Sequence, residues 1–158
     1  MTLHTDQMSD SFRIGAMLAV VGGFLDAYTY LARGQVFANA QTGNIVLLGV
    51  HLSEGDFKKA LSYLVPILAF VAGIFVDEWI KHRLEGKVAL HWRQTVLLIE
   101  ILALIVVIFL PLGKADPLAN ALVSFICSMQ VQSFRKFHGM PYATTMCTGN
   151  LRSGTDHL

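Results

Sequence analysis

Two acidic residues, Asp26 and Glu100, stand inside long apolar stretches of the sequence. An ionised carboxylate at the centre of a bilayer costs roughly 2.5–3.5 kcal/mol on insertion scales, so such a group faces the protein interior or water. Intramembrane acids commonly bind protons or cations, and both residues are therefore candidate proton sites. The alternatives are a structural hydrogen bond between Asp26 and a neighbouring helix, and an ion pair between Glu100 and a loop arginine.

A second chemical signal is the tripeptide Thr-Gly-Asn, which occurs at residues 42–44 and again at residues 148–150, an offset of 106 (148 − 42). Threonine can cap the start of a helix, and glycine lets the backbone approach a ligand closely. The free amides and the positive end of the helix dipole then attract an anion. Alternatively, each copy is an ordinary break between two helices.

We expect the two copies to meet near the bilayer midplane, because irregular backbone at membrane depth survives only when it is buried in protein or lines a wet cavity. Arg152 adds a charge that either pairs with an anionic substrate or Asp26, or is solvated. The candidate substrate-binding residues are Asp26, Asn39, Thr42, Gly43, Asn44, Thr145, Thr148, Gly149, Asn150 and Arg152.

The sequence holds no hydrolase elbow, phosphate-binding loop, zinc-protease motif or dinucleotide fingerprint. Cys127 and Cys147 fit neither a metal spacing nor a disulfide framework, and we interpret them as packing residues. The net charge of +1 gives no basic footprint for nucleic acid. We therefore expect no catalytic residue, no metal, no cofactor and no nucleic-acid partner.

The elements that position these residues are predicted to be transmembrane helices. Hydrophobic residues make up 54% of the chain and charged residues only 15%, whereas a soluble domain has about 25% charged residues. Four stretches are apolar and long enough to cross a hydrocarbon core of about 30 Å: residues 14–31, 61–80, 95–112 and 117–134. The sequence thus predicts an all-α, polytopic transmembrane helix bundle.

Two further segments, residues 35–52 and 140–158, are predicted to be an irregular stretch followed by a short helix, because glycine, proline and small polar residues interrupt them. We interpret them as matching parts of an internal repeat. Residues 1–112 would be the first repeat, and residues 113–158 would begin a second, C-terminally truncated one. Three crossings between the copies would invert the second copy, which we favour; a full crossing by residues 35–52 would make the copies parallel.

The basic residues of the loops predict the orientation in the membrane. The loop of residues 81–93 holds four lysines and arginines, whereas the loop of residues 113–116 holds one. The first loop is therefore predicted to be cytoplasmic and the second to be external. Asp77 and Glu78, at the cytoplasmic end of their apolar stretch, are expected to lie at the surface.

Four sequence runs carry a resemblance to a known family: G-G-F-L-D-A-Y-T-Y-L, F-A-N-A-Q-T-G-N, M-Q-V-Q-S-F and Y-A-T-T-M-C-T-G-N-L. They are similar to the YoaK family of bacterial membrane proteins, over the whole chain. The resemblance implies a multi-pass protein of the inner (plasma) membrane and supplies no reaction, substrate or cofactor. Members of that family continue beyond the point where this sequence stops.

The repeat, the broken helices and Asp26 together favour a secondary transporter or channel for a small solute, with an anion as one option. One alternative is a membrane scaffold or assembly protein, in which the Thr-Gly-Asn motifs only set helix packing. Another is a membrane-embedded enzyme, which would need a nucleophile or metal set that the sequence does not reveal. The expected partners are the lipid bilayer and an unidentified small solute, and the oligomeric state is open.

Overall fold

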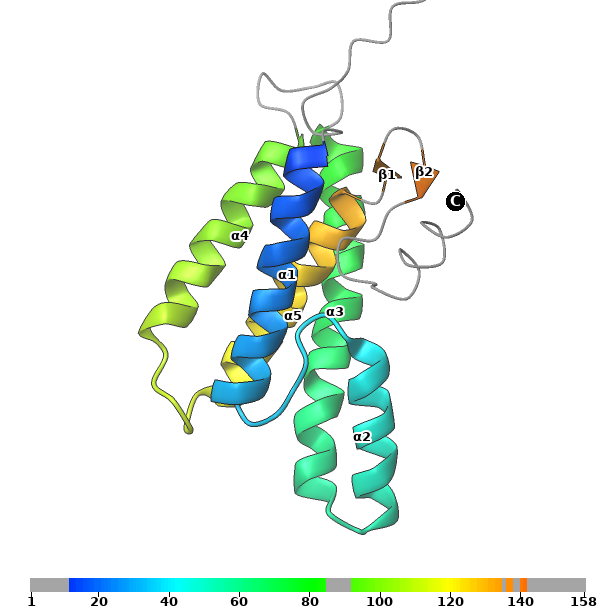
Figure 1. The fold of residues 1–158 in the computed structure, drawn as a ribbon, viewed down its shortest axis with the longest axis vertical. Helices are drawn as coiled ribbons and strands as arrows, with labels where there is room; N and C mark the ends of the chain where they lie inside the picture. Colours follow the sequence, from blue (N-terminus) through cyan, green and yellow to red (C-terminus); the bar gives the residue numbers. More distant parts are fainter. Residues whose placement is uncertain (1–11, 85–91, 135, 138–139, 142–158) are drawn as a thin grey trace, which may run out of the picture.

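Five α-helices and one short β ladder form the described part of the chain, residues 12–84, 92–134, 136–137 and 140–141 of a computed structural model. The elements are α1 (Phe12–Ala32), α2 (Gln41–Ser53), α3 (Phe57–Leu84), α4 (Trp92–Phe109), α5 (Asp116–Ser133), β1 (Lys136–Phe137) and β2 (Met140–Pro141), as Figure 1 shows. The two strands pair antiparallel. The structure therefore confirms the predicted all-helical class, and the ladder is its only departure among the described residues.

Helix α5 occupies the centre of the bundle and packs against α3, α4 and α1. Helices α1 and α4 run in one direction, and α3 and α5 run in the opposite direction (Figure 1). Helix α2 packs against α3. Together α2 and the first half of α3 form a hairpin that extends beyond the ends of α1, α4 and α5 (Figure 1).

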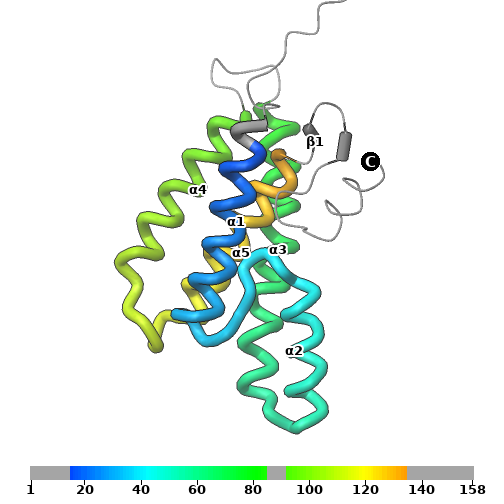
Figure 2. Tube along the Cα trace, in the orientation of Figure 1, coloured from blue at the N-terminus to red at the C-terminus, as the bar shows by residue number. Residues whose placement is uncertain are grey.

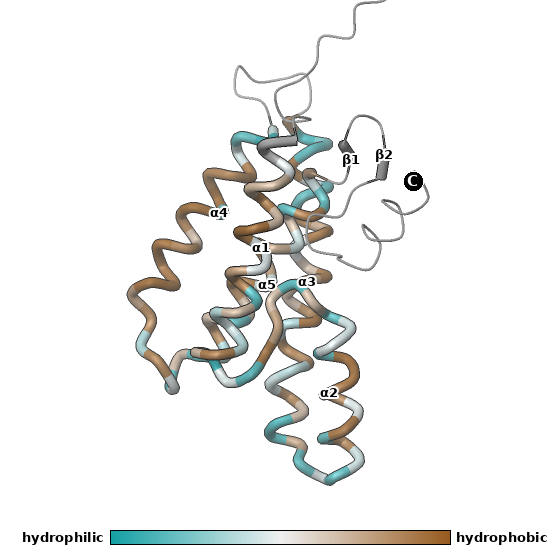
Figure 3. The backbone as a smooth tube through the Cα atoms, viewed as in Figure 1, coloured by the Kyte–Doolittle hydropathy of each residue, from teal (hydrophilic) through white to brown (hydrophobic). Residues whose placement is uncertain are grey.

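Three described helices contain stretches long and apolar enough to cross a membrane: Gly15–Ala32, Phe57–Leu84 and Trp92–Phe109. Their outward faces expose large apolar side chains, including Phe24, Phe75 and Ile108. Figure 3 shows the apolar positions continuing along α4, while polar positions gather at helix ends and in the α2–α3 turn. This distribution suits contact with lipid tails along the helices and with water or head groups at their ends.

The fourth predicted span corresponds to α5, which is not among these three helices. Its buried positions include the polar residues Asn120, Ser124, Ser128 and Gln130. A helix surrounded by other helices does not face lipid, so it is free to use small and polar side chains for interhelical contacts. A membrane crossing by α5 therefore stays a prediction.

The expectation that Asp77 lies at the surface is wrong. Asp77 is completely buried in α3, and its carboxylate accepts a hydrogen bond from the hydroxyl of Ser133 in α5. Glu78, one position on, is partly exposed and accepts a hydrogen bond from the Gln132 side chain at 3.0 Å. The sequence placed both acids at the end of an apolar stretch but did not show that α5 covers this part of α3.

The segment between α1 and α2 breaks the helical path and reverses it. Gly34 and Gln35 both have positive φ angles, 88° and 65°, directly after α1 ends. The chain then turns back toward the middle of the bundle before α2 begins at Gln41 (Figure 2). This geometry confirms the predicted irregular stretch and short helix in residues 35–52. The matching segment, residues 140–158, lies outside the described residues apart from the strand at Met140–Pro141.

Candidate functional site

Asp26 joins α1 to the irregular segment before α2. One oxygen of its carboxylate, Oδ1, accepts a hydrogen bond of 2.7 Å from the backbone amide of Asn39. The side chain of Asp26 is only partly buried. The carboxylate thus lies where the free amides ahead of α2 would otherwise attract an anion from outside the protein.

The side chain of Asn39 makes a second link to α1. Its Nδ2 donates to the backbone carbonyl of Gly22 at 3.1 Å, one turn before Asp26. Its Oδ1 is buried and has no hydrogen-bond partner among the described residues. Asn39 and Asp26, two of the predicted site residues, are therefore in direct contact, and the thiol of Cys127 in α5 lies near the Asn39 side chain.

Asn44 closes the irregular segment on itself. Its Oδ1 accepts from the amide of Phe37 at 3.0 Å, and its Nδ2 donates to the carbonyl of Phe37 at 2.7 Å and to Oε1 of Gln41 at 2.9 Å. Every strong hydrogen-bonding direction of this buried amide except one lone pair is used within its own chain. Asn44 therefore stabilises the turn that precedes α2 through these three hydrogen bonds.

Thr42 does not cap α2, so that expectation is wrong. The residue before the helix is Ala40, which makes no side-chain cap. Thr42 is the second residue of α2 and is exposed. The first turn instead receives its side-chain contacts from Asn44 and Gln41, whose Nε2 donates to the carbonyl of Ala38 at 2.8 Å. The side-chain amides of Gln41 and Asn44 thus make the contacts that were expected of the Thr42 hydroxyl.

Gly43 faces the ring of Phe37. A Cβ atom on Gly43 would lie 2.9 Å from Cδ2 and 3.0 Å from Cε2 of that ring, which is closer than real Cβ contacts. The ring of Phe37 in turn stacks on Tyr30 of α1, with centroids 4.8 Å apart. The close approach that this glycine permits is therefore made by a side chain of the protein itself.

Glu100, the second candidate proton site, is buried in α4. Its Oε1 has no hydrogen-bond partner among the described residues. Asp77 of α3 lies close enough for the two carboxyl charges to interact. Asp26 and Glu100 both also lie near enough to Cys127 of α5 for their charges to act on its thiol. Three helices thus contribute one carboxyl group each to the interior.

Arg33 is a buried cation that the sequence did not single out. Its guanidinium forms an ion pair of 3.2 Å with Asp116 and donates 2.7 Å to the hydroxyl of Tyr28. It also donates to carbonyls in the last turn of α4 and just after it, those of Val107, Leu110 and Pro111. Burial acts to lower the pKa of Arg33, but the hydrogen bonds with Tyr28 and Asp116 outweigh it and raise that pKa, so the group stays charged.

An arginine directly after an apolar stretch usually extends to the membrane surface, which is why sequence reasoning missed this one. Its role depends on the α4–α5 connection, which lies more than 70 residues away in the chain. The local sequence carries no sign of that contact. Among the residues that the structure describes, no group of three or more metal-ligating acids, histidines or cysteines is present.

The structure brings together only part of the predicted substrate site. Asp26, Asn39 and Asn44 lie in one connected region through their contacts with the segment between α1 and α2. The second half of the predicted site lies outside the described residues: Thr145, Thr148, Gly149, Asn150 and Arg152. The meeting of the two Thr-Gly-Asn motifs therefore stays a prediction.

Comparison with known proteins places the chain in a family. A family model described as "Protein of unknown function (DUF1275)" matches residues 14–158. The UPF0700 transmembrane protein YoaK of Bacillus subtilis (strain 168) is 26% identical over 144 residues, which cover 87% of this chain and 63% of that relative. The chain thus spans less than two thirds of the relative's length, and no solved structure matches it. With three apolar helices of spanning length, the chain is a membrane protein and belongs to the DUF1275 family.

Proposed function

We propose that this protein carries a small solute across the inner membrane as a multi-pass secondary transporter or channel. The observation that carries the proposal is the contact between the Asp26 carboxylate in α1 and the amide of Asn39 ahead of α2. Secondary transporters commonly place broken helices and ionisable groups near the bilayer midplane, where the substrate and coupling ion bind. The proposal includes no catalytic step and no partners beyond lipid and the solute.

The depth of the break supports this proposal. Gly22, which binds the Asn39 side chain, lies ten residues (32 − 22) before the end of the apolar stretch Gly15–Ala32. At a rise of about 1.5 Å per residue this is about 15 Å, or half of a hydrocarbon core of about 30 Å. A segment that returns to this depth and then leads into α2 has the form of a half-helix beginning near the midplane.

Asp26 supplies a way to couple a proton to the solute. Protonation would remove the negative charge that now accepts from the amide of Asn39. The positive end of α2 and its amides would then be free to bind an anionic solute. In this mechanism the proton and the anion bind in the same step and move together.

The directions of two helices support the inverted repeat. The repeat offset pairs α1 with α5, because Tyr28 and Phe134 are 106 residues apart (134 − 28). Helices α1 and α5 run in opposite directions (Figure 1). Opposite directions are expected when the second copy is inverted in the membrane, and parallel copies would run alike.

A membrane scaffold is the second candidate function, and the contacts made by the first Thr-Gly-Asn tripeptide favour it. Asn44 locks the turn before α2, and Gly43 accommodates Phe37. Both contacts are internal to the protein and need no solute. In a scaffold, Asp26 would serve only to hold the broken segment against α1.

The test compares Asp26→Asn with the wild-type protein in proteoliposomes loaded with a pH-sensitive dye. The panel of solutes covers short carboxylates, amino acids and inorganic anions. An asparagine at position 26 keeps an oxygen that accepts from Asn39, so the fold is retained while the titratable group is lost. We expect solute-driven proton entry with the wild type and none with Asp26→Asn. Glu54→Gln, which alters an exposed acid, is the matched control and should retain the activity.

Unchanged uptake and an unchanged pH profile in Asp26→Asn would contradict the coupling role of this residue. A wild-type protein that is folded and moves no solute in the panel would favour the scaffold instead. Thermal unfolding of each variant in detergent shows whether the fold is intact.

A further inference from the structure

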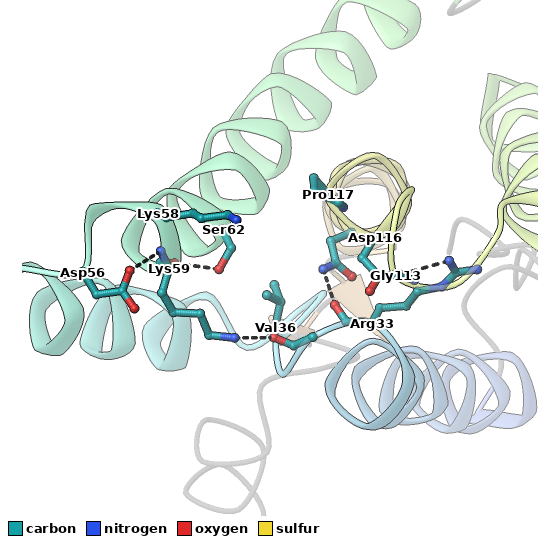
Figure 4. A pocket seen from close by; sticks show the side chains of 11 residues that line it. Arg33, Val36, Asp56, Lys58, Lys59, Ser62, Gly113, Asp116 and Pro117 are labelled. Carbon is teal, nitrogen blue, oxygen red and sulfur yellow. Dashed lines mark hydrogen bonds and ion pairs between the residues drawn. The ribbon is translucent and has the colours of Figure 1, made fainter.

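At the end of the bundle that holds the α4–α5 connection, the buried charge has its partners within the protein. Arg33 pairs with Asp116 at 3.2 Å, beside a cavity of about 310 Å³ (Figure 4). The side chain of Asn120 donates to the backbone carbonyl of Arg33 at 2.7 Å, and the ammonium of Lys59 donates to the carbonyl of Gly34 at 2.9 Å. The buried charge of Arg33 is therefore neutralised locally.

Two acids, Asp77 of α3 and Glu100 of α4, are buried nearer the opposite end, with 0% and 7% of their surface exposed. Asp77 lies seven residues (84 − 77) before the last residue of α3, and Glu100 lies eight (100 − 92) after the first residue of α4. At a rise of about 1.5 Å per residue, these positions are about 10 Å and about 12 Å from the helix ends. Helix α3 ends and α4 begins at the same end of the bundle (Figure 1), so the two acids lie at the same level.

The packing around these acids also brings them together. Ile80, one turn after Asp77, and Val96, one turn before Glu100, belong to one apolar cluster with Met129 of α5. The charges of the two carboxyl groups interact directly. Asp77 and Glu100 are therefore a buried carboxyl pair that two different helices supply.

The two carboxyl groups differ in their hydrogen bonds. Oδ1 of Asp77 accepts from the hydroxyl of Ser133 in α5, which stabilises a negative charge on Asp77. Oε1 of Glu100 is buried and has no hydrogen-bond partner among the described residues. A buried carboxylate oxygen without a donor is costly, whereas a protonated carboxylic acid is neutral and is itself a donor.

One cation lies close to the pair. The guanidinium of Arg93 in α4 lies 5.9 Å from the ring centroid of Phe134, the residue that follows Ser133. A single positive charge can balance one negative charge on the pair but not two. The other titratable groups around the pair include Glu78 of α3 with its partners Lys81 and His82, and Cys127 of α5.

We propose that Asp77 and Glu100 form a proton-binding site in which the two carboxyl groups share one proton. Glu100 carries the proton, and its O–H donates to the carboxylate of Asp77. The proton thus joins α3 to α4, and its loss leaves two negative charges at close range that repel each other. The sequence pointed to Glu100 alone, and the structure supplies its partner. The site is separate from Asp26 and does not rest on transport, since a transporter and a scaffold could both contain it.

Infrared spectroscopy of the full chain in detergent tests the pair, because a protonated carboxylic acid has a C=O stretch that is separate from the stretches of a carboxylate. We expect Glu100→Gln to remove one such band at neutral pH, while its amide keeps a donor for Asp77. Asp77→Asn should retain the Glu100 band and shift it to higher wavenumber, because a neutral amide is a weaker acceptor than a carboxylate. Glu54→Gln, which alters an exposed acid, serves as the control and should leave the band unchanged.

The second measurement is the thermal midpoint of unfolding as a function of pH. The folded pair binds a proton that the unfolded chain releases, so stability falls as the pH rises. We expect the wild-type midpoint to fall by about 5 °C between about pH 6 and about pH 9, and Glu100→Gln to lose most of this fall.

Retention of every carboxylic-acid band in Glu100→Gln would overturn the proposal, because Glu100 would then be ionised in the wild type. A midpoint that rises with sodium chloride but not with choline chloride, in the wild type but not in Glu100→Gln, would also overturn it and would identify a metal-cation site instead. If Glu100→Gln does not fold, Asp77→Asn decides: an unshifted carboxylic-acid band contradicts the shared proton. None of these outcomes depends on whether the protein moves a solute.

Discussion

At the scale of single residues, the buried charge of Arg33 is balanced by partners that lie beside it in space but far from it in the sequence. Arg33 is 2% exposed, yet its guanidinium donates to Asp116 and to carbonyls in the last turn of α4 and just after it. Removing one partner of such a buried pair typically costs about 3–5 kcal/mol, because the other charge is left unpaired. The pair therefore fixes the end of α1 against the α4–α5 connection.

The glycine of the first tripeptide separates two explanations of the motif. If Gly43 makes room for Phe37, Gly43→Val should lower the free energy of unfolding by about 1–3 kcal/mol through overpacking. In a Phe37→Ala background the same substitution should cost much less, because the clashing ring atoms are gone. Thermal unfolding in detergent measures this double-mutant cycle.

Gly49→Val is the matched control for that cycle, since a Cβ at Gly49 of the same helix meets nothing within 4 Å. It should change stability only slightly in either background. If Gly43→Val is stable alone but blocks solute uptake, and Phe37→Ala does not restore uptake, then Gly43 faces a ligand and the packing explanation fails.

The chemical types of residues could be predicted from the sequence better than their partners. An acid in an apolar stretch implies an interior position, and Asp26 and Glu100 follow that rule. The sequence predicted that Asp26 and Asn39 lie near each other. It did not predict that the backbone amide of Asn39 donates to the Asp26 carboxylate. Asn120 and Asp77 were missed because their roles depend on which helix covers them, and that information is not local.

At the scale of helices, the contact between α3 and α5 depends on a close approach. Gly73 of α3 is buried against Ser128 and the backbone carbonyl of Phe125 in α5. Small residues at such contacts let helix backbones come together, and packing replaces the hydrophobic effect as the source of association in lipid. The central position of α5 follows from this fit.

Gly73→Ala should therefore be strongly destabilising. A Cβ at this position would overlap Ser128 Oγ and the carbonyl oxygen of Phe125, and the backbone atom cannot rotate away. We expect a loss of about 3 kcal/mol, or a failure to fold, as a fall in the thermal midpoint in detergent. Gly23→Ala in α1 is the control: its Cβ meets nothing, and the change should be within about 1 kcal/mol and favourable. Equal behaviour of the two variants would contradict the close contact.

The apolar stretches of spanning length in α1, α3 and α4 could be predicted from the sequence because these helices expose apolar faces. Helix α3 is longer than its predicted stretch, since Phe57–Leu84 includes polar ends that a hydropathy window excludes. The polar content of α5 reflects burial among other helices, which composition alone cannot distinguish from exposure to water. The break after Ala32 could be predicted because glycine and small polar residues gather there.

At the scale of the whole molecule, the helix directions place the loops at two ends. The α2–α3 turn and the α4–α5 connection lie at one end, and the end of α3 and the start of α4 lie at the other (Figure 1). At or next to the second end, the sequence has seven basic residues: Arg13, Lys81, Arg83, Lys87, Arg93, Arg135 and Lys136. Apart from the paired Arg33, the first end has three: Lys58, Lys59 and Lys114. The second end thus has the larger number of basic residues, seven against three, which agrees with the cytoplasmic side predicted from the loops.

The helix directions also predict the orientation of α1 and α2 in the membrane, which the basic residues of the loops alone did not determine. In a background with Cys127→Ser and Cys147→Ser, an impermeant thiol reagent on intact cells should label Ala115→Cys and Ser53→Cys, and should spare Lys87→Cys. Permeabilised cells, the control, should show labelling at all three positions. The reason is that Ser53 and Ala115 lie at the same end of the bundle, while position 87 follows α3 at the other.

Labelling of position 87 with position 115 protected would reverse the orientation. Labelling of 115 with protection of 53 would instead contradict the path of α2, because a helix that returns from the midplane must leave on the side from which the broken segment entered.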